Sequence, residues 1–161
     1  MNLELTNKIL ANETYHKELE ELRRLEKDRI FCGHDIQHFL DIARITMIIC
    51  HEKGIDVMPD LIYSASLLHD IGRTKEYSEN IPHHIAGKEI AEKILDETGC
   101  SSGIKNRILS LIVNHRNQQN EKDSLESIFY MADKKSRLCF ACPSRKICNW
   151  KEEKKNMNIE V

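Results

Sequence analysis

The stretch LLHDIGRTKEYSENIPHH, residues 67–84, contains four side chains that can bind a metal ion: His69, Asp70, His83 and His84. Histidine nitrogens combined with carboxylate oxygens favour Mn, Fe, Co, Ni or Zn over Ca, which prefers oxygen ligands alone. Such an ion lowers the pKa of a bound water towards neutrality and makes a hydroxide nucleophile available. The stretch therefore predicts a metal centre that activates water.

Three further metal-capable residues stand out along the chain: His38, His115 and Asp133. With enough ligands for two ions, a centre can clamp both the attacking and the bridging oxygens of a phosphoryl group. A phosphoester is the natural substrate, because its transition state places negative charge on oxygens that metal ions and cations stabilise. The ligand types thus favour hydrolysis of a phosphorylated compound.

Apolar residues follow helical spacing through most of the chain, and strand-like alternation is rare. Asp35 is expected to cap a helix that extends to about His51. Asp56 or Pro59 is expected to start the next helix, which Gly72 ends. A polar loop is expected at residues 73–82. The remaining helices are expected at residues 3–27 (one or two helices), 83–99, 101–116 and 125–138, with a short one after Pro143.

These elements place the candidate ligands close to helix ends, where several helices can converge on one point. His38 falls in the first turn of its helix, and the His69–Asp70 pair falls at the end of the next. His83 or His84 opens the helix that follows the polar loop. His115 lies near the end of its helix, and Asp133 lies within the last long one.

Composition narrows the range of partners. The 161 residues fit one domain, and 40% hydrophobic with 31% charged residues is an ordinary globular balance. The net charge of −2 offers no broad basic field, so neither nucleic acid nor a membrane is an expected partner. Glu4 and Lys8 interrupt the apolar pattern of the N-terminus, and no apolar run approaches the roughly 20 residues of a transmembrane helix. A cytoplasmic location is expected.

The ordered pieces HDIQHFLDIARI, SASLLHDIGR, HHIAGKEIAEKIL, IVNHR and MADK resemble the HD-domain superfamily of metal-dependent phosphohydrolases. The resemblance implies an all-α fold, an HD-domain helical bundle of about six to seven helices. It implies one domain over residues 1–161, with its core at about residues 30–136 and a short cysteine-containing tail at residues 137–161. It also implies a small phosphorylated substrate. It leaves open whether the protein forms a homodimer.

By position, the resemblance assigns the core metal site to four residues: His38, His69, Asp70 and Asp133. His83, four residues before Gly87, matches the family's ligand to a second ion better than His84 does, and His115 is its companion. Asp70 would then bridge the two ions, as in dinuclear members of the family. Other members hold a single ion, so the resemblance implies one or two divalent transition-metal ions.

Arg73 stands where many family members have Lys, and a guanidinium there can grip a phosphate with two hydrogen bonds. Asp70 and Arg73 are therefore the expected catalytic residues, with Arg116, Lys134 and Lys135 as further cations near the ligands. Acidic residues that some (p)ppGpp-hydrolysing members carry just after the HD pair are replaced here by Arg73 and Thr74. The glutamate that some 5′-nucleotidases use is also missing, which disfavours both activities.

The tail contains a second group of potential ligands in CFACPSRKIC, with a Cys-x2-Cys-x5-Cys spacing. A tight cysteine cluster in a reducing compartment predicts metal binding before it predicts disulfides. Cys139, Cys142 and Cys148 leave one ligand position open. Cys32, Cys50, Cys100, a histidine or solvent could complete the set, and Cys32 is favoured. Cys32 lies six residues before His38 and Cys139 six residues after Asp133, so the two flanking segments can meet if His38 and Asp133 share a metal ion. A structural zinc, an iron–sulfur cluster and free cysteines remain alternatives.

The leading hypothesis is a metal-dependent phosphohydrolase that acts on a small phosphorylated metabolite, with a nucleotide favoured. Two alternatives stay open. A di-iron oxygenase with the HD fold would use the same ligands to activate oxygen. A non-catalytic nucleotide or redox sensor would use the HD site for binding and the cysteines for signalling.

Overall fold

The computed structural model describes residues 2–160, which form α-helices joined by short turns and contain no β-strand. The expected all-α helical fold is confirmed. The α-helices are α1 (Glu4–Leu10), α2 (Glu13–Leu25), α3 (Ile36–Glu52), α4 (Pro59–Leu68), α5 (Arg73–Glu79), α6 (His83–Glu97), α7 (Ser102–Asn114) and α8 (Leu125–Lys135). Three single 3-10 turns follow: η1 (Cys139–Ala141), η2 (Arg145–Ile147) and η3 (Glu152–Lys154). Within residues 2–160 no helix has the length and apolar character required to cross a bilayer.

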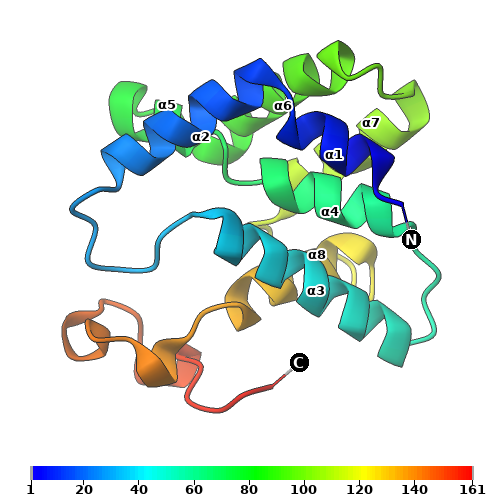
Figure 1. The fold of residues 1–161 in the computed structure, drawn as a ribbon. Coiled ribbons are helices and arrows are strands. Elements are labelled where there is room, and N and C mark those ends of the chain that lie inside the picture. The colour runs from blue at the N-terminus through cyan, green and yellow to red at the C-terminus, as the bar shows by residue number, and fades with distance from the viewer. Residues whose placement is uncertain (1, 161) are drawn as a thin grey trace.

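Helix α4 forms the centre of the bundle and lies between α1 and α3 (Figure 1). Residues 61, 62 and 64–68 of this helix are all buried, so it is enclosed on nearly every side. A helix that is apolar all round is stable only inside a core. Its buried position carries the following His69–Asp70 pair into the interior, where both residues are at most 2% exposed.

Local signals start the helices where the sequence predicts them. The Asp35 side chain accepts a hydrogen bond from the backbone N–H of His38 (2.9 Å) and caps α3. Ser124 caps α8 in the same way, with the N–H of Ser127 at 3.2 Å. Pro59 occupies the first turn of α4. These caps decide where the ligand-bearing turns of α3 and α8 begin.

The predicted loop at residues 73–82 is wrong, because its first part is helix α5. Thr74 is buried and donates a hydrogen bond to Glu18 of α2 (2.7 Å), and Tyr77 donates one to Glu26 (2.7 Å). Asn80 then ends the helix in the left-handed conformation (φ 58°). Polar contacts with α2 stabilise this short helix, and apolar periodicity does not record such contacts.

Gly72 lies where the turn after Asp70 crosses the first turns of α6. A Cβ atom at this position would come within 2.2 Å of both the Gly87 nitrogen and the His83 oxygen. Both neighbours are backbone atoms, so they cannot rotate away as a flexible side chain would. The absence of a side chain at Gly72 therefore allows His83 to approach the His69–Asp70 pair.

We expect Gly72→Ala to lower the free energy of unfolding by about 3 kcal/mol, because the added methyl group forces the backbones apart. The melting temperature should fall by roughly 6–12 °C. Gly103→Ala is the matched control. No atom lies within 4 Å of its added Cβ, and alanine in a helix should be neutral or stabilise by about 0.5–1 kcal/mol. Equal melting temperatures for the two variants would contradict the close approach.

Candidate metal centre

Five segments distant in sequence bring the predicted ligands together at one end of the bundle. His38 lies in the first turn of α3, and His69 directly follows α4. His83 is the first residue of α6, His115 directly follows α7, and Asp133 lies in the last turn of α8. Each residue lies at or directly after a helix end, close to its predicted position. His38 is partly exposed, and the other five predicted ligands are buried.

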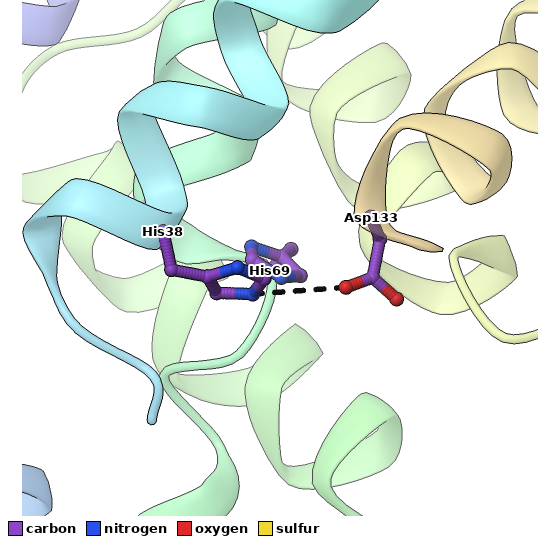
Figure 2. Close-up of side chains that lie close together, drawn as sticks. All are labelled: His38, His69 and Asp133. Carbon is purple, nitrogen blue, oxygen red and sulfur yellow. Dashed lines mark ion pairs between the residues drawn. The ribbon is translucent and has the colours of Figure 1, made fainter. Parts of the chain in front are cut away.

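One group of ligand atoms belongs to His38, His69 and Asp133, and these atoms lie within 4.8 Å of one another. Figure 2 shows the three side chains pointing towards a common space from α3, the end of α4 and α8. The His38 Nε2 atom is 3.6 Å from Asp133 Oδ1. Both atoms are buried without a hydrogen-bond partner, and so is His69 Nε2. Buried polar atoms left unpaired carry a large desolvation cost, which a bound cation would remove.

A second group consists of Asp70, His83 and His115, whose ligand atoms also lie within 4.8 Å of one another. The Asp70 Oδ1 atom is 3.2 Å from His83 Nε2 and 3.7 Å from His115 Nε2. The two imidazole Nε2 atoms are 3.1 Å apart. All three residues are buried.

Asp70 lies between the two groups. Its Oδ2 atom faces the first group, 3.1 Å from His69 Nε2 and 3.8 Å from His38 Nε2. Its Oδ1 atom faces His83 and His115. One carboxylate thus presents one oxygen to each group, which is the arrangement required for bridging two ions.

Neighbouring acceptors hold the imidazole rings so that each Nε2 faces inwards. The His69 Nδ1 donates to the carbonyl oxygen of Ser66 (2.7 Å), and His115 Nδ1 donates to that of Ile112 (2.5 Å). His83 Nδ1 contacts the Glu76 carboxylate (2.8 Å). Such partners fix the tautomer and raise the basicity of the inward nitrogen. His38 has a weaker support, its Nδ1 lying 3.2 Å from the Ser136 hydroxyl.

The electrostatic state of the residues suits metal binding. Burial lowers the pKa of His115 to about 3 and that of His83 to about 4, so both rings are neutral at pH 7. Burial opposes ionisation of Asp70, but His69 and Arg73 hold the pKa of this carboxyl well below its ordinary value. Metal binding needs neutral imidazoles and ionised carboxylates, which His83, His115 and Asp70 provide. Burial opposes a charged His69 ring, but Asp70 raises the pKa of this ring, so a metal ion bound there would displace its proton.

Cationic side chains lie directly beside the carboxylates. The Arg73 Nε is 2.9 Å from Asp70 Oδ1, and its Nη1 is 3.2 Å from Glu76 Oε2. Lys134 pairs with the Asp133 carboxylate. Burial opposes ionisation of Asp133, but the charge of Lys134 lowers the pKa of this carboxyl to about 2. Arg73 therefore contacts the predicted bridging carboxylate itself, in addition to facing the cavity. Lys135 instead pairs with Glu160 of the tail (3.6 Å).

A cavity of about 460 Å³ opens over the two groups. Its wall includes His83, His115 and Asp133 from the candidate centre. It also includes Arg29, Arg73, Arg116, Lys134 and Arg137, all cationic. Phe31, Asn149 and Trp150 complete the opposite side, the last two from the tail. The volume is within the range that ligand pockets of small molecules occupy.

His34 and Glu26 were not among the predicted site residues. In the structure His34 is 4% exposed and lines the cavity, with its Nε2 3.7 Å from Asp70 Oδ2. The Glu26 carboxylate accepts hydrogen bonds from the His34 ring (2.5 Å) and from its backbone N–H (2.8 Å). Burial opposes its ionisation, yet the His34 hydrogen bond lowers the pKa of Glu26 to about 2. Glu26 lies within the charged stretch LEELRRLEKDR, residues 19–29, which is typical of a solvent-exposed helix face, so the sequence contains no signal for this contact.

The predicted cysteine ligands lie near the same cavity but are not gathered as tightly. Cys32, Cys139 and Cys148 line its wall, and Cys142 does not. All six cysteines are free. Within residues 2–160, no cysteine sulfur belongs to a set of three metal-capable atoms within 4.8 Å of one another. The ligand role of these cysteines stays a prediction.

The contact between Glu76 and His83 leads to a test of the second group. We expect Glu76→Ala to weaken binding of one of two ions by 10- to 100-fold, because the His83 ring loses the acceptor that orients it. Titration calorimetry with Mn²⁺ or Zn²⁺ measures this loss. Glu79→Ala, in the same helix but exposed, should bind like the unaltered protein. Equal affinities in both variants would show that Glu76 does not support a metal ligand.

Comparison with known proteins places the chain in a family. The HD-domain family model matches residues 35–138, a segment that contains all six predicted His and Asp ligands. An uncharacterized protein from Clostridium beijerinckii is 39% identical over 153 residues, covering 95% of this chain and 96% of that protein. No solved structure matches the chain.

Ribonucleases are also similar over part of their length. Ribonuclease Y from Clostridium botulinum is 35% identical over 79 residues, or 48% of this chain and 15% of that enzyme. Ribonuclease Y 1 from Levilactobacillus brevis is 29% identical over 140 residues, or 78% of this chain and 27% of that enzyme. The family match covers more than half of the residues and includes both ligand groups, and we conclude that this chain belongs to the HD-domain family.

Proposed function

We propose that this protein is a metal-dependent phosphohydrolase that acts on a small phosphorylated metabolite, a nucleotide being favoured, by means of metal-activated water. The observation that carries the proposal is the position of Asp70 between two ligand groups at the base of a cationic cavity. Members of the HD-domain family are generally metal-dependent hydrolases, which agrees with this arrangement.

The donor atoms fit one or two divalent transition-metal ions. Four imidazole nitrogens and two carboxylates make a mixed nitrogen and oxygen set, which suits Mn, Fe, Co, Ni or Zn. His38, His69 and Asp133 would hold one ion, His83 and His115 the other, and Asp70 both. The unpaired inward atoms of the first group support this assignment. When bound, such ions lower the pKa of a coordinated water and polarise a phosphoryl oxygen.

The protein's own cations would hold the substrate. The side chains of Arg73 and Lys134 lie beside the two candidate carboxylates, and Arg116 lies further out with 54% of its side chain exposed. A guanidinium can bind two phosphate oxygens at once and so orient the phosphoryl group for attack. Each such charge also stabilises the negative oxygens of the transition state.

Three features favour a nucleotide over a polymer. The cavity of about 460 Å³ suits a small molecule. Phe31 and Trp150 line it together with the cations, and aromatic rings can stack on a base. The net charge of −2 provides no extended basic surface to follow a nucleic-acid backbone.

The direct test is metal analysis of anaerobically purified protein, followed by a hydrolysis screen with the metal found. The screen should include nucleotides, sugar phosphates and a short oligoribonucleotide, and phosphate release should occur with a small phosphorylated compound. Cleavage of the oligoribonucleotide alone would refute the small substrate. Oxygen consumption with a mixed-valence iron signal, or tight nucleotide binding without turnover, would support the oxygenase or the sensor instead.

In the same assays Asp70→Ala should lose both ions and fall below detectable hydrolysis, because it removes a ligand of each group. Asp70→Asn keeps the volume of the side chain but not its charge, and it should lose activity as well. Circular dichroism checks that both variants fold. The control is Asp56→Ala, in the exposed connector before α4, which should behave like the unaltered protein. Retained turnover of Asp70→Ala would refute the mechanism.

Arg116 offers a test of phosphate binding away from the ligands. We expect Arg116→Ala to raise KM about 10-fold with little change in kcat, since a charge-assisted hydrogen bond contributes about 1.5–3 kcal/mol. Arg107→Ala removes an exposed arginine of α7 that does not line this cavity, and it should leave both kcat and KM unchanged. Identical steady-state kinetics for the two variants would exclude Arg116 from substrate binding.

A further inference from the structure

The tail, residues 137–160, has almost no hydrophobic core of its own. It contains three single 3-10 turns, and within residues 137–160 Cys139 is the one buried apolar side chain. Five of its apolar residues are 40% to 85% exposed (Leu138, Phe140, Ile147, Met157 and Ile159), and Trp150 is only partly buried. In Figure 1 the tail, coloured orange to red, lies beside the helical bundle as a separate layer. Burial of apolar surface therefore contributes little to its stability.

Polar contacts nevertheless give the tail a defined path. The Ser144 hydroxyl donates to the carbonyl oxygen of Ile30 (2.5 Å), and Lys155 Nζ donates to that of Arg145 (3.0 Å). Asn156 Nδ2 donates to the carbonyl oxygens of Lys134 (2.7 Å) and Arg137 (2.9 Å). Individual hydrogen bonds contribute little net stability compared with the entropy lost on ordering a backbone. A cross-link is the remaining way to stabilise such a segment.

The cysteines occupy the positions at which a cross-link would act. The N–H of Cys142 donates to the Cys139 carbonyl oxygen (3.2 Å), and two further turns lead through Arg145 to Cys148. Ser144, between Cys142 and Cys148, binds the residue two places before Cys32. Cys32, Cys139 and Cys148 consequently border one cavity from two distant segments of the chain.

We propose that Cys32, Cys139, Cys142 and Cys148 bind an iron–sulfur cluster that joins the tail to the segment before α3. A tetrahedral zinc ion with Zn–S bonds of about 2.3 Å would hold its sulfurs about 4 Å apart. In the described part of the chain no cysteine sulfur belongs to a set of three metal-capable atoms that all lie within 4.8 Å of one another. A cluster binds each thiolate to a different iron and so accepts sulfurs that lie further apart. Each thiol releases its proton to the solvent when it binds iron.

Charge and location support the assignment. A cluster with four thiolate ligands is anionic, and Arg29 and Arg137 line the same wall of the cavity. Arg29 Nε donates to the Cys32 carbonyl oxygen (2.7 Å), and the Arg137 guanidinium lies 4.2 Å from the centre of the Trp150 ring. The cluster would hold Asn149 and Trp150 in place as the outer wall of the cavity. This site is separate from the His and Asp groups and adds to the proposed hydrolase.

The experiment is anaerobic purification of the full chain, with reconstitution by ferric iron and sulfide in the presence of a thiol reductant, so that the assembled cluster contains ferric iron. Iron and acid-labile sulfide should be present in equal amounts beyond the metal of the His and Asp centre, with visible absorption that reduction bleaches. Serine substitutions at Cys32, Cys139, Cys142 and Cys148, made one at a time, should each lose or greatly weaken this absorption. Cys100→Ser, in the turn between α6 and α7, should keep it.

Two controls separate the cluster from folding and from hydrolysis. Unaltered protein with and without the cluster should differ in limited proteolysis, with faster trypsin cleavage in the tail when the cluster is absent. Asp70→Asn should keep the cluster absorption while it loses hydrolysis, so the two proposals fail independently. If the same cysteines bound zinc, the proposal of an iron–sulfur cluster would be refuted. The proposed cysteine ligands would be refuted if all four serine variants kept the sulfide content and visible absorption of the unaltered protein. They would also be refuted if the unaltered protein contained no sulfide after reconstitution.

Discussion

The burial of one negative charge, the carboxylate of Asp70, sets the conditions for the rest of the structure. The residue is 2% exposed, and a carboxylate removed from water is stable only when opposite charges or hydrogen-bond donors surround it. His69, His83 and Arg73 lie within 3.2 Å of its two oxygens. His69 and Arg73 are close neighbours of Asp70 in the sequence, whereas His83 comes from the start of α6. The contact of His83 with this carboxylate therefore joins the end of α4 to the start of α6.

The fold supplies this convergence through α4 and a single glycine. Because α4 is buried on nearly every side, its end delivers the His69–Asp70 pair to the interior without a loop. Gly72 then lets the backbone of α6 approach closely enough to place His83 beside Asp70. The tight backbone crossing and the short distance between His83 and Asp70 are two aspects of one packing arrangement.

Around the ligands lies a layer of carboxylates and hydroxyls that orient them. Glu76 supports His83, Ser136 contacts His38, and Glu26 holds His34 at the cavity wall. These groups come from α5, from the end of α8 and from the segment after α2, which are peripheral elements of the bundle. The periphery of the fold thus decides ring orientation and the shape of the cavity, whereas its centre decides the position of Asp70.

The sequence by itself determined the helices with strong apolar periodicity, the cap at Asp35, and the six His and Asp residues that converge. These features are local or depend on residue type, and so they can be read from one chain. Only the tertiary structure decided that residues 73–79 are helical and that Glu26 and Glu76 face histidines. It also decided that Cys32, Cys139 and Cys148 border the same cavity as the metal centre. Those outcomes depend on contacts between segments distant in sequence, whose energies leave no periodic or compositional pattern in the chain.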